Sequence, residues 1–215
     1  MIVAIHGIIF DLDGVLIHTD QYHYQAWKRL ADRLEIPFDE TVNNRLRGVS
    51  RMESLDIVLE RYHGQPLSKT DKERLAEEKN GVYRALLGRM TPASVDPGVR
   101  ETLGQLRGRG YRLAVGSSSK NARIILERVG LTDAFDAISD GTNIARSKPD
   151  PEVVLKAAEF LRLEPSQCAV VEDARSGIDA AIAAGMLPVG IGDAADYAKA
   201  AHKISTVEGL LILFS

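Results

Sequence analysis

The stretch Ile8-Ile9-Phe10-Asp11-Leu12-Asp13-Gly14 decides the fold of this chain. It ends a largely apolar and β-branched run that begins at Ile2, and such a run predicts a strand buried on both faces of a sheet. The run stops at a polar turn that carries two aspartates. We therefore expect a covered sheet whose first strand delivers carboxylates to its carboxyl end.

Further strands and helices alternate downstream of this one. Apolar runs predict strands at 111–115, 135–138, 168–171 and 187–191. Helical patterns predict helices after Asp96-Pro97, at 124–129, after Asp150-Pro151 and at 175–184. The buried stripe of the helix after Asp150-Pro151 is predicted to be Val154, Leu155, Ala158 and Leu161. The tail 204–215 predicts a short strand and a helix. Such alternation predicts βαβ units. The expected fold class is α/β, a Rossmann-like parallel sheet core with helices on both faces.

One interval breaks the alternation. The residues between the first strand and Asp96 have helical periodicity, with one helix around Trp27, a second around Leu55 and a third that starts at a capping box, Thr70 and Glu73. We expect residues 18–90 to form an inserted all-helical cap domain, and residues 1–17 and 91–215 to form the α/β catalytic core. An insertion at this point lies over the carboxyl ends of the strands, where α/β proteins bind ligands.

Composition excludes several classes of protein. Of 215 residues, 45% are hydrophobic and 27% are charged, which is typical of a globular chain, and the net charge of -3 favours neither nucleic acid nor an anionic membrane as a partner. The single cysteine, Cys168, excludes a disulfide framework. The first residues lack the cationic flank of a signal peptide. We expect a cytoplasmic monomer.

Polar residues gather where the predicted strands end. Two carboxylate pairs, a hydroxyl and an ammonium are delivered to one edge of the sheet: Asp11 and Asp13, Glu172 and Asp173, Ser117, and Lys148. Carboxylates at this density need a cation, and hard oxygen ligands suit Mg²⁺. A lysine and a serine beside them suit phosphate oxygens. The pattern predicts phosphoryl transfer with one aspartate as nucleophile.

Each of these motifs has a plainer interpretation when it is taken alone. Asp11 and Asp13 could cap a helix or form a turn, and Glu172 and Asp173 could cap the helix that follows them. Lys148 could be a solvated loop residue. The functional interpretation depends on all of the motifs occurring together.

Together they resemble a known superfamily. Phe10-Asp-Leu-Asp-Gly-Val-Leu16, Ser117, Lys148-Pro149 and Glu172-Asp173-Ala-Arg-Ser-Gly177 match, in order, the four motifs of the haloacid dehalogenase-like phosphohydrolases and phosphomutases. Further stretches, most of them in the insertion, narrow the resemblance to the β-phosphoglucomutase family within that superfamily. The stretches concerned are Tyr22-His23-Tyr-Gln-Ala-Trp27-Lys28, Leu46-Arg-Gly-Val-Ser-Arg51-x-Glu-Ser-Leu55, Lys79-Asn80, Thr91-Pro-Ala-x-Val95 and Ser117-x-Ser119-Lys-Asn121.

The resemblance implies a role for each matching residue in the core. Asp11 would be the nucleophile that becomes an aspartyl phosphate, and Asp13 the general acid/base. Ser117 and Lys148 would bind the transferring phosphoryl group. Mg²⁺ would be held by Asp11, the backbone carbonyl of Asp13, Glu172 and Asp173.

The cap residues would recognise the substrate. Arg51 would clamp the distal phosphate, and His23 would hydrogen-bond near Asp13. The other residues implied to bind the substrate are Thr19, Arg47, Gly48, Ser50, Lys79, Ser119 and Asn121. The implied reaction interconverts β-D-glucose 1-phosphate and glucose 6-phosphate, with β-glucose 1,6-bisphosphate as intermediate and activator.

Two departures from the family pattern keep an alternative open. Arg47 stands where the family pattern has lysine, and His18 replaces an acid before Thr19. The alternative is a Mg²⁺-dependent sugar-phosphate phosphatase, in which water takes the phosphoryl group. A catalytically silent sugar-phosphate binding protein is disfavoured because no core catalytic position is missing.

Overall fold

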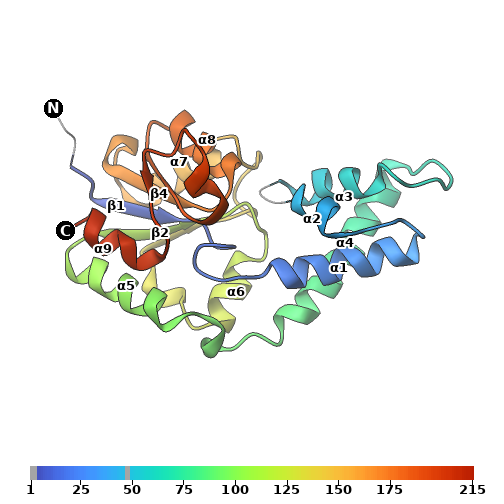
Figure 1. The fold of residues 1–215 in the computed structure, drawn as a ribbon, viewed down its shortest axis with the longest axis horizontal. Helices are drawn as coiled ribbons and strands as arrows, with labels where there is room; N and C mark the ends of the chain where they lie inside the picture. The colour runs from blue at the N-terminus through green and yellow to red at the C-terminus, as the bar shows by residue number, and fades with distance from the viewer. Residues whose placement is uncertain (1–3, 47–48) are drawn as a thin grey trace. The chain divides into compact units, whose positions relative to one another are not determined.

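The computed structural model describes residues 4–46 and 49–215. Within this part the chain forms two compact units (Figure 1). The first contains the chain up to His18 together with Met90–Ser215, and the second is Thr19–Arg89. The assignment of these units as catalytic core and cap stays a prediction.

A parallel sheet organises the first unit. Its strands lie in the order β3-β2-β1-β4-β5-β6, and every pairing is parallel. The strands are β1 (Gly7–Phe10), β2 (Arg112–Gly116), β3 (Ala137–Ser139), β4 (Cys168–Glu172), β5 (Leu187–Gly190) and β6 (His202–Lys203). The first strand of the chain thus lies in the middle of the sheet, where both faces and both edges are covered.

Helices cover the two faces of this sheet. Figure 1 shows α7 (Glu152–Leu161) and α8 (Arg175–Ala183) on one face, and α5 (Pro97–Gly108) with α9 (Leu210–Leu213) on the other. The remaining helical segments of this unit are α6 (Ala122–Arg128) and the 3-10 turns Pro92–Ser94, Thr132–Ala134, Pro165–Gln167, Gly192–Asp196 and Val207–Gly209. The predicted fold class, a Rossmann-like parallel sheet with helices on both faces, is confirmed.

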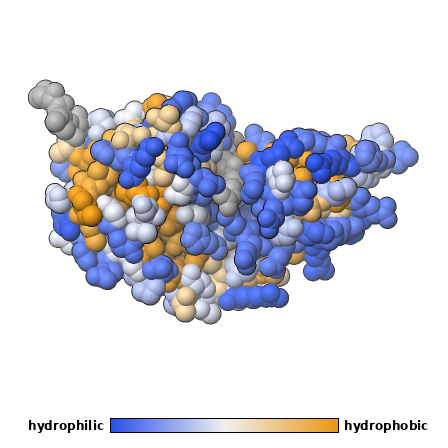
Figure 2. All heavy atoms as spheres, viewed as in Figure 1, coloured by the Kyte–Doolittle hydropathy of each residue, from blue (hydrophilic) through white to orange (hydrophobic). Residues whose placement is uncertain are grey.

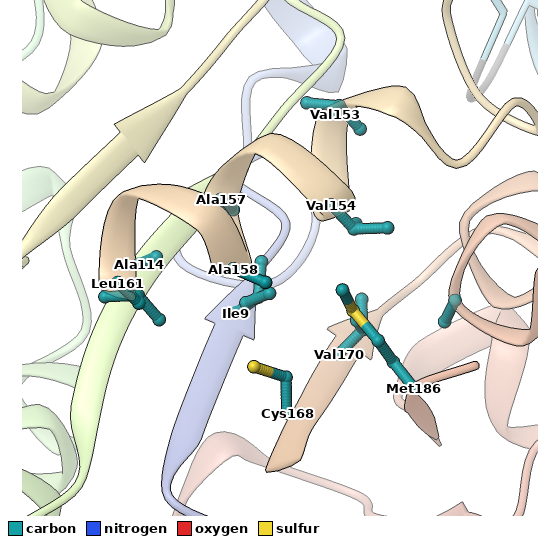
Figure 3. Packing of buried hydrophobic residues seen from close by; sticks show 11 residues of the cluster. Ile9, Ala114, Val153, Val154, Ala157, Ala158, Leu161, Cys168, Val170 and Met186 are labelled. Carbon is teal, nitrogen blue, oxygen red and sulfur yellow. The ribbon is translucent and has the colours of Figure 1, made fainter. Parts of the chain in front are cut away.

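Apolar packing fixes α7 against the sheet. Figure 3 shows residues of α7 lying over Ile9, Ala114 and Val170 from the three central strands. The buried residues of α7 are Val153, Val154, Ala157, Ala158 and Leu161. The prediction that Leu155 belongs to this stripe is wrong, because its side chain is exposed. Since Ile9 is fully buried here, the end of β1 is held rigidly where Asp11 follows.

The second unit is entirely helical in its described part. It contains α1 (Asp20–Arg33), α2 (Glu40–Asn44), α3 (Arg51–Leu59) and α4 (Lys69–Leu87). Trp27, Leu30 and Leu55 lie in its apolar core, while hydrophilic side chains cover most of its visible face (Figure 2). The predicted capping box at Thr70 and Glu73 is wrong: Ser68 and Asp71 form it, two residues earlier.

The ends of the chain differ from expectation. Within the described residues the first strand begins at Gly7, so the prediction that it includes residues 4–6 is wrong. Residues 1–3, where the predicted strand starts, lie outside the described part. The short strand of the tail is His202–Lys203, which precedes the predicted start at Ile204. None of the described helices is both long enough and apolar enough to cross a membrane.

Candidate active site

The register of the sheet brings Asp11 next to Glu172. Phe10 lies opposite Val115 on one side and Val171 on the other, so the next residue of each strand reaches the same edge. The backbone N–H of Asp11 donates to the carbonyl of Val171 at 2.9 Å, which continues the pairing past the end of β1. Two buried carboxylates therefore meet at the middle of the sheet.

Lys148 joins these two carboxylates. Its Nζ lies 2.6 Å from Asp11 Oδ1 and also donates to Glu172 Oε1. The side chain of Lys148 is only 4% exposed. Burial alone would lower the pKa of Lys148, but the charges of Asp11 and Glu172 outweigh it and raise the pKa. The ammonium therefore stays charged, and a cation is fixed beside the predicted nucleophile.

Glu172 has a strongly altered ionisation. Burial raises the pKa of its carboxyl to about 7, the charge of Lys148 opposes this shift, and the charge of Asp11 adds to it. Gly177 makes room for this side chain, because a Cβ there would lie 1.9 Å from the carboxyl carbon of Glu172. Carboxylates with raised pKa values at a sheet edge are typical of functional sites.

Asp173 completes an oxygen-rich cluster. One oxygen from each of Asp11, Glu172 and Asp173 lies within 4.8 Å of the others. These three carboxylates bring hard oxygen donors together at the spacing of metal ligands, which fits Mg²⁺. Gly14, at φ +89°, lies against Asp173: a Cβ there would be 2.1 Å from Asp173 Oδ2. The glycine after the aspartate pair is therefore needed for this carboxylate to approach.

The loop after β2 carries Ser117, Ser119 and Asn121. Ser117 is buried, and its Oγ accepts the backbone N–H of Ser119 at 3.2 Å; Ser119 Oγ accepts the N–H of Asn121 in the same way. These bonds from backbone N–H groups to serine hydroxyls two residues earlier hold the loop in a turn conformation. Ser118 Oγ accepts the backbone N–H of Lys148 at 3.3 Å, so this loop also holds the lysine segment.

Ser118 is a residue of the site that the sequence analysis did not single out. A run of three serines does not show which hydroxyl faces which neighbour.

Asp13 lies in the predicted turn, where it is half-buried and forms an isolated bridge to Ile17. Its predicted role as acid/base stays a prediction, as do the roles of the other site residues.

In the second unit, a buried lysine lies among aromatic rings. Lys79 Nζ is 2.8 Å from His23 Nδ1 and lies 4.6 Å from the ring centre of Trp27 and 4.8 Å from that of Tyr83. The ring of His23 lies 4.0 Å from that of Tyr83. Burial, and then the charges of Lys79 and Arg51, lower the pKa of His23 well below its usual value. Neutral His23 can accept a hydrogen bond from the Lys79 ammonium.

Arg51 starts α3, directly after Ser50. Ser50 caps this helix: its Oγ accepts the N–H of Glu53 at 3.3 Å, and its own N–H donates to Glu53 Oε2 at 2.8 Å. The hydroxyl of Ser50 thus helps to position Arg51.

Thr19 is buried and precedes α1. Arg47 and Gly48, which the sequence analysis assigned to substrate binding, lie outside the described residues.

Comparison with known proteins gives consistent results. Residues 5–185 match the family described as haloacid dehalogenase-like hydrolase. The chain is 43% identical to a β-phosphoglucomutase of Bacillus subtilis, over 86% of this chain and 83% of that protein. It is 34% identical to a phosphorylated carbohydrates phosphatase of Thermotoga maritima, over 84% and 82%. The crystal structure of a β-phosphoglucomutase from Clostridium difficile superposes with a TM-score of 0.88 at 38% identity, covering 96% of this chain and 93% of that one.

Proposed function

The chain belongs to the haloacid dehalogenase-like hydrolase family, and from this membership we propose that it is a phosphomutase. It interconverts β-D-glucose 1-phosphate and glucose 6-phosphate through β-glucose 1,6-bisphosphate. The observation that carries the proposal is the Asp11 carboxylate, held 2.6 Å from the buried ammonium of Lys148 at the centre of the sheet edge. The similarity to β-phosphoglucomutases supports the choice of substrate.

The reaction proceeds in two phosphoryl transfers. Asp11 attacks one phosphorus of β-glucose 1,6-bisphosphate, a bond forms between its carboxylate oxygen and phosphorus, and the bond from phosphorus to the sugar oxygen breaks, which leaves a glucose monophosphate. Asp13 gives its proton to the leaving sugar oxygen. In the second transfer Asp13 takes the proton of the incoming sugar hydroxyl, which attacks the aspartyl phosphate and restores Asp11.

The neighbours of Asp11 stabilise the charge on the moving group. Lys148 Nζ and the Ser117 hydroxyl donate hydrogen bonds to the phosphoryl oxygens. Asp11, Glu172 and Asp173, with the backbone carbonyl of Asp13, would hold Mg²⁺. This ion, when bound, neutralises phosphoryl charge and reduces repulsion between Asp11 and its substrate.

The second unit supplies the groups that recognise the rest of the substrate. Arg51 holds the distal phosphate, since a guanidinium can donate two parallel hydrogen bonds to it. The other groups of this unit that contact the sugar or its distal phosphate are Thr19, His23, Arg47, Gly48, Ser50 and Lys79. The first unit adds Ser119 and Asn121. This unit acts as a cap that keeps water from the phosphoenzyme.

A sugar-phosphate phosphatase is the second candidate. It is favoured by the similarity to a phosphorylated carbohydrates phosphatase and by the departures at His18 and Arg47. The two candidates share the phosphoenzyme and differ only in what accepts the phosphoryl group.

Phosphorus NMR separates these candidates. The protein is incubated with β-glucose 1-phosphate, Mg²⁺ and a trace of the 1,6-bisphosphate. A mutase gives stoichiometric glucose 6-phosphate with little free phosphate, whereas inorganic phosphate that grows in step with lost substrate assigns the phosphatase. A spectrum that does not change at all contradicts both assignments of substrate.

A further inference from the structure

An acidic side chain lies against the predicted phosphate clamp. Arg51 Nη1 donates to Glu77 Oε2 at 3.2 Å, and the other oxygen of Glu77 accepts Asn80 Nδ2 at 3.3 Å. Arg51 starts α3, and Glu77 lies in the middle of α4, on the helix that also carries Lys79. The contact therefore joins two of the helices that carry predicted substrate-binding residues.

The two partners of this pair differ in their access to solvent. The side chain of Glu77 is 68% exposed and that of Arg51 is 26% exposed. The carboxylate is thus the outer, solvated partner, and the guanidinium is the more enclosed one. Burial lowers the pKa of Arg51, and the charge of Glu77 opposes this shift. Glu77 therefore stabilises the Arg51 cation in the absence of another anion.

We infer that Glu77 competes with the substrate phosphate for Arg51 and so lowers the affinity of Arg51 for that phosphate. This inference rests on the proposed role of Arg51 as the clamp for the distal phosphate. A phosphate that approaches Arg51 needs N–H donors of the same guanidinium and meets the negative charge of Glu77 beside them. Binding of the phosphate therefore either breaks the Arg51–Glu77 bond or brings two anions close enough to repel each other.

The size of the effect follows from the exposure of Glu77. An ion pair with a solvated partner contributes little, because water screens its charge and the carboxylate can turn away. Glu77 weakens phosphate binding without preventing it. We expect removal of its charge to tighten binding about three- to fivefold, within the range of such pairs.

The variant Glu77→Gln tests this directly. Glutamine removes the charge and keeps one oxygen, which can accept from Arg51, while its amide group replaces the oxygen that accepts from Asn80. The expected result is tighter binding of glucose 6-phosphate by calorimetry and a lower KM for β-glucose 1-phosphate. Glu78→Gln is the matched control: it removes the same charge at the next residue, where the carboxylate is paired with Arg33 through bonds of 2.9 and 2.8 Å.

The outcomes decide the role of Glu77. Tighter binding in Glu77→Gln but not in Glu78→Gln, and its disappearance when Arg51→Gln is added, supports the inference. Unchanged or weaker binding, an equal gain in both variants, or a gain that persists without Arg51 overturns it. Failure of the wild-type protein to convert β-glucose 1-phosphate would instead defeat the proposed function, and the calorimetric comparison would still decide between these outcomes for Glu77.

Discussion

Gly14 combines a positive φ with close contact to Asp173, a member of the acidic cluster. Its φ of +89° disfavours any side chain, and a Cβ would lie 2.1 Å from Asp173 Oδ2. We expect Gly14→Ala to lower the free energy of unfolding by about 1–2 kcal/mol. It should also raise the Mg²⁺ concentration for half-maximal activity about tenfold, because Asp173 is displaced. Urea unfolding and a Mg²⁺ titration of activity measure the two effects.

Gly110 provides the control for backbone strain. It has a φ of +90°, and a Cβ there would meet nothing within 4 Å. Gly110→Ala should therefore lose similar stability and keep the Mg²⁺ dependence of the wild type. An equal shift of the Mg²⁺ dependence in both variants would show that strain, and not the contact with Asp173, is the cause.

Lys148 separates two buried carboxylates, and its removal leaves them facing each other. We expect Lys148→Ala to lower the free energy of unfolding by about 3 kcal/mol in the absence of divalent cations. Mg²⁺ should recover more stability in this variant than in the wild type, because it replaces a lost positive charge. Unfolding with EDTA and with Mg²⁺ measures this difference, and an equal Mg²⁺ effect in both proteins would contradict the account.

At the scale of elements, the start of α7 holds the loop that leads to Lys148. Glu152 accepts the backbone N–H of Ala145 (3.0 Å to Oε2) and of Arg146 (2.9 Å), and these bonds lower the pKa of its carboxyl. Glu152→Ala should reduce kcat about tenfold, because Lys148 is no longer held in place. Glu152→Gln, which keeps one acceptor, should recover part of this loss.

Glu159 is the control for this effect, since it lies exposed on the same helix. Glu159→Ala should leave kcat close to that of the wild type. Steady-state kinetics on all three variants is the measurement, and an equal loss in Glu152→Ala and Glu159→Ala would remove the assigned role of Glu152.

His23 of α1 is buried beside Lys79 of α4, and this burial makes the free energy of unfolding depend on pH. Burial and the charges of Lys79 and Arg51 hold the pKa of His23 below its unfolded value of about 6.5. At a pH between the pKa of His23 in the folded protein and its pKa in the unfolded chain, only the unfolded chain binds the proton. The free energy of unfolding therefore falls as pH drops below about 6.5. From pH 7.5 to 5.5 we expect His23 to account for about 1 kcal/mol of lost stability.

Replacement of His23 isolates this contribution. His23→Gln should lose less stability than the wild type between these pH values, as measured by urea unfolding at each pH. His63→Gln replaces an exposed histidine of the same unit and should behave as the wild type does. An unchanged pH dependence in His23→Gln would show that His23 does not carry the proton.

Most helices and strands were predictable because their signals are local. Asp96 before Pro97 predicts the start of α5, and the apolar run before Glu172 predicts β4; both are confirmed. The start of α4 differs from the prediction because Thr70 and Glu73 fit the usual capping-box pattern, in which Glu or Gln is the third residue, whereas the box that forms uses an aspartate, Asp71. The short α2 has too few residues for a helical period to show.

At the scale of the whole chain, the candidate core site was predictable because parallel strands end at one edge. The common edge of the strands correctly predicts that Asp11, Lys148 and Glu172 lie together. It cannot predict contacts made by loops, such as the bond from the backbone N–H of Lys148 to Ser118 Oγ. Nor does it predict the pairing of Arg51 with Glu77, because this depends on how two helices pack.

The central claim is that Asp11 carries the phosphoryl group. The protein is mixed with β-glucose 1,6-bisphosphate labelled in its phosphates, quenched in acid and digested, and the label is located by mass spectrometry. The account predicts one labelled peptide, which contains Asp11, and no label or turnover in Asp11→Asn. A phosphoryl group on another residue, or turnover retained by Asp11→Asn, would contradict it.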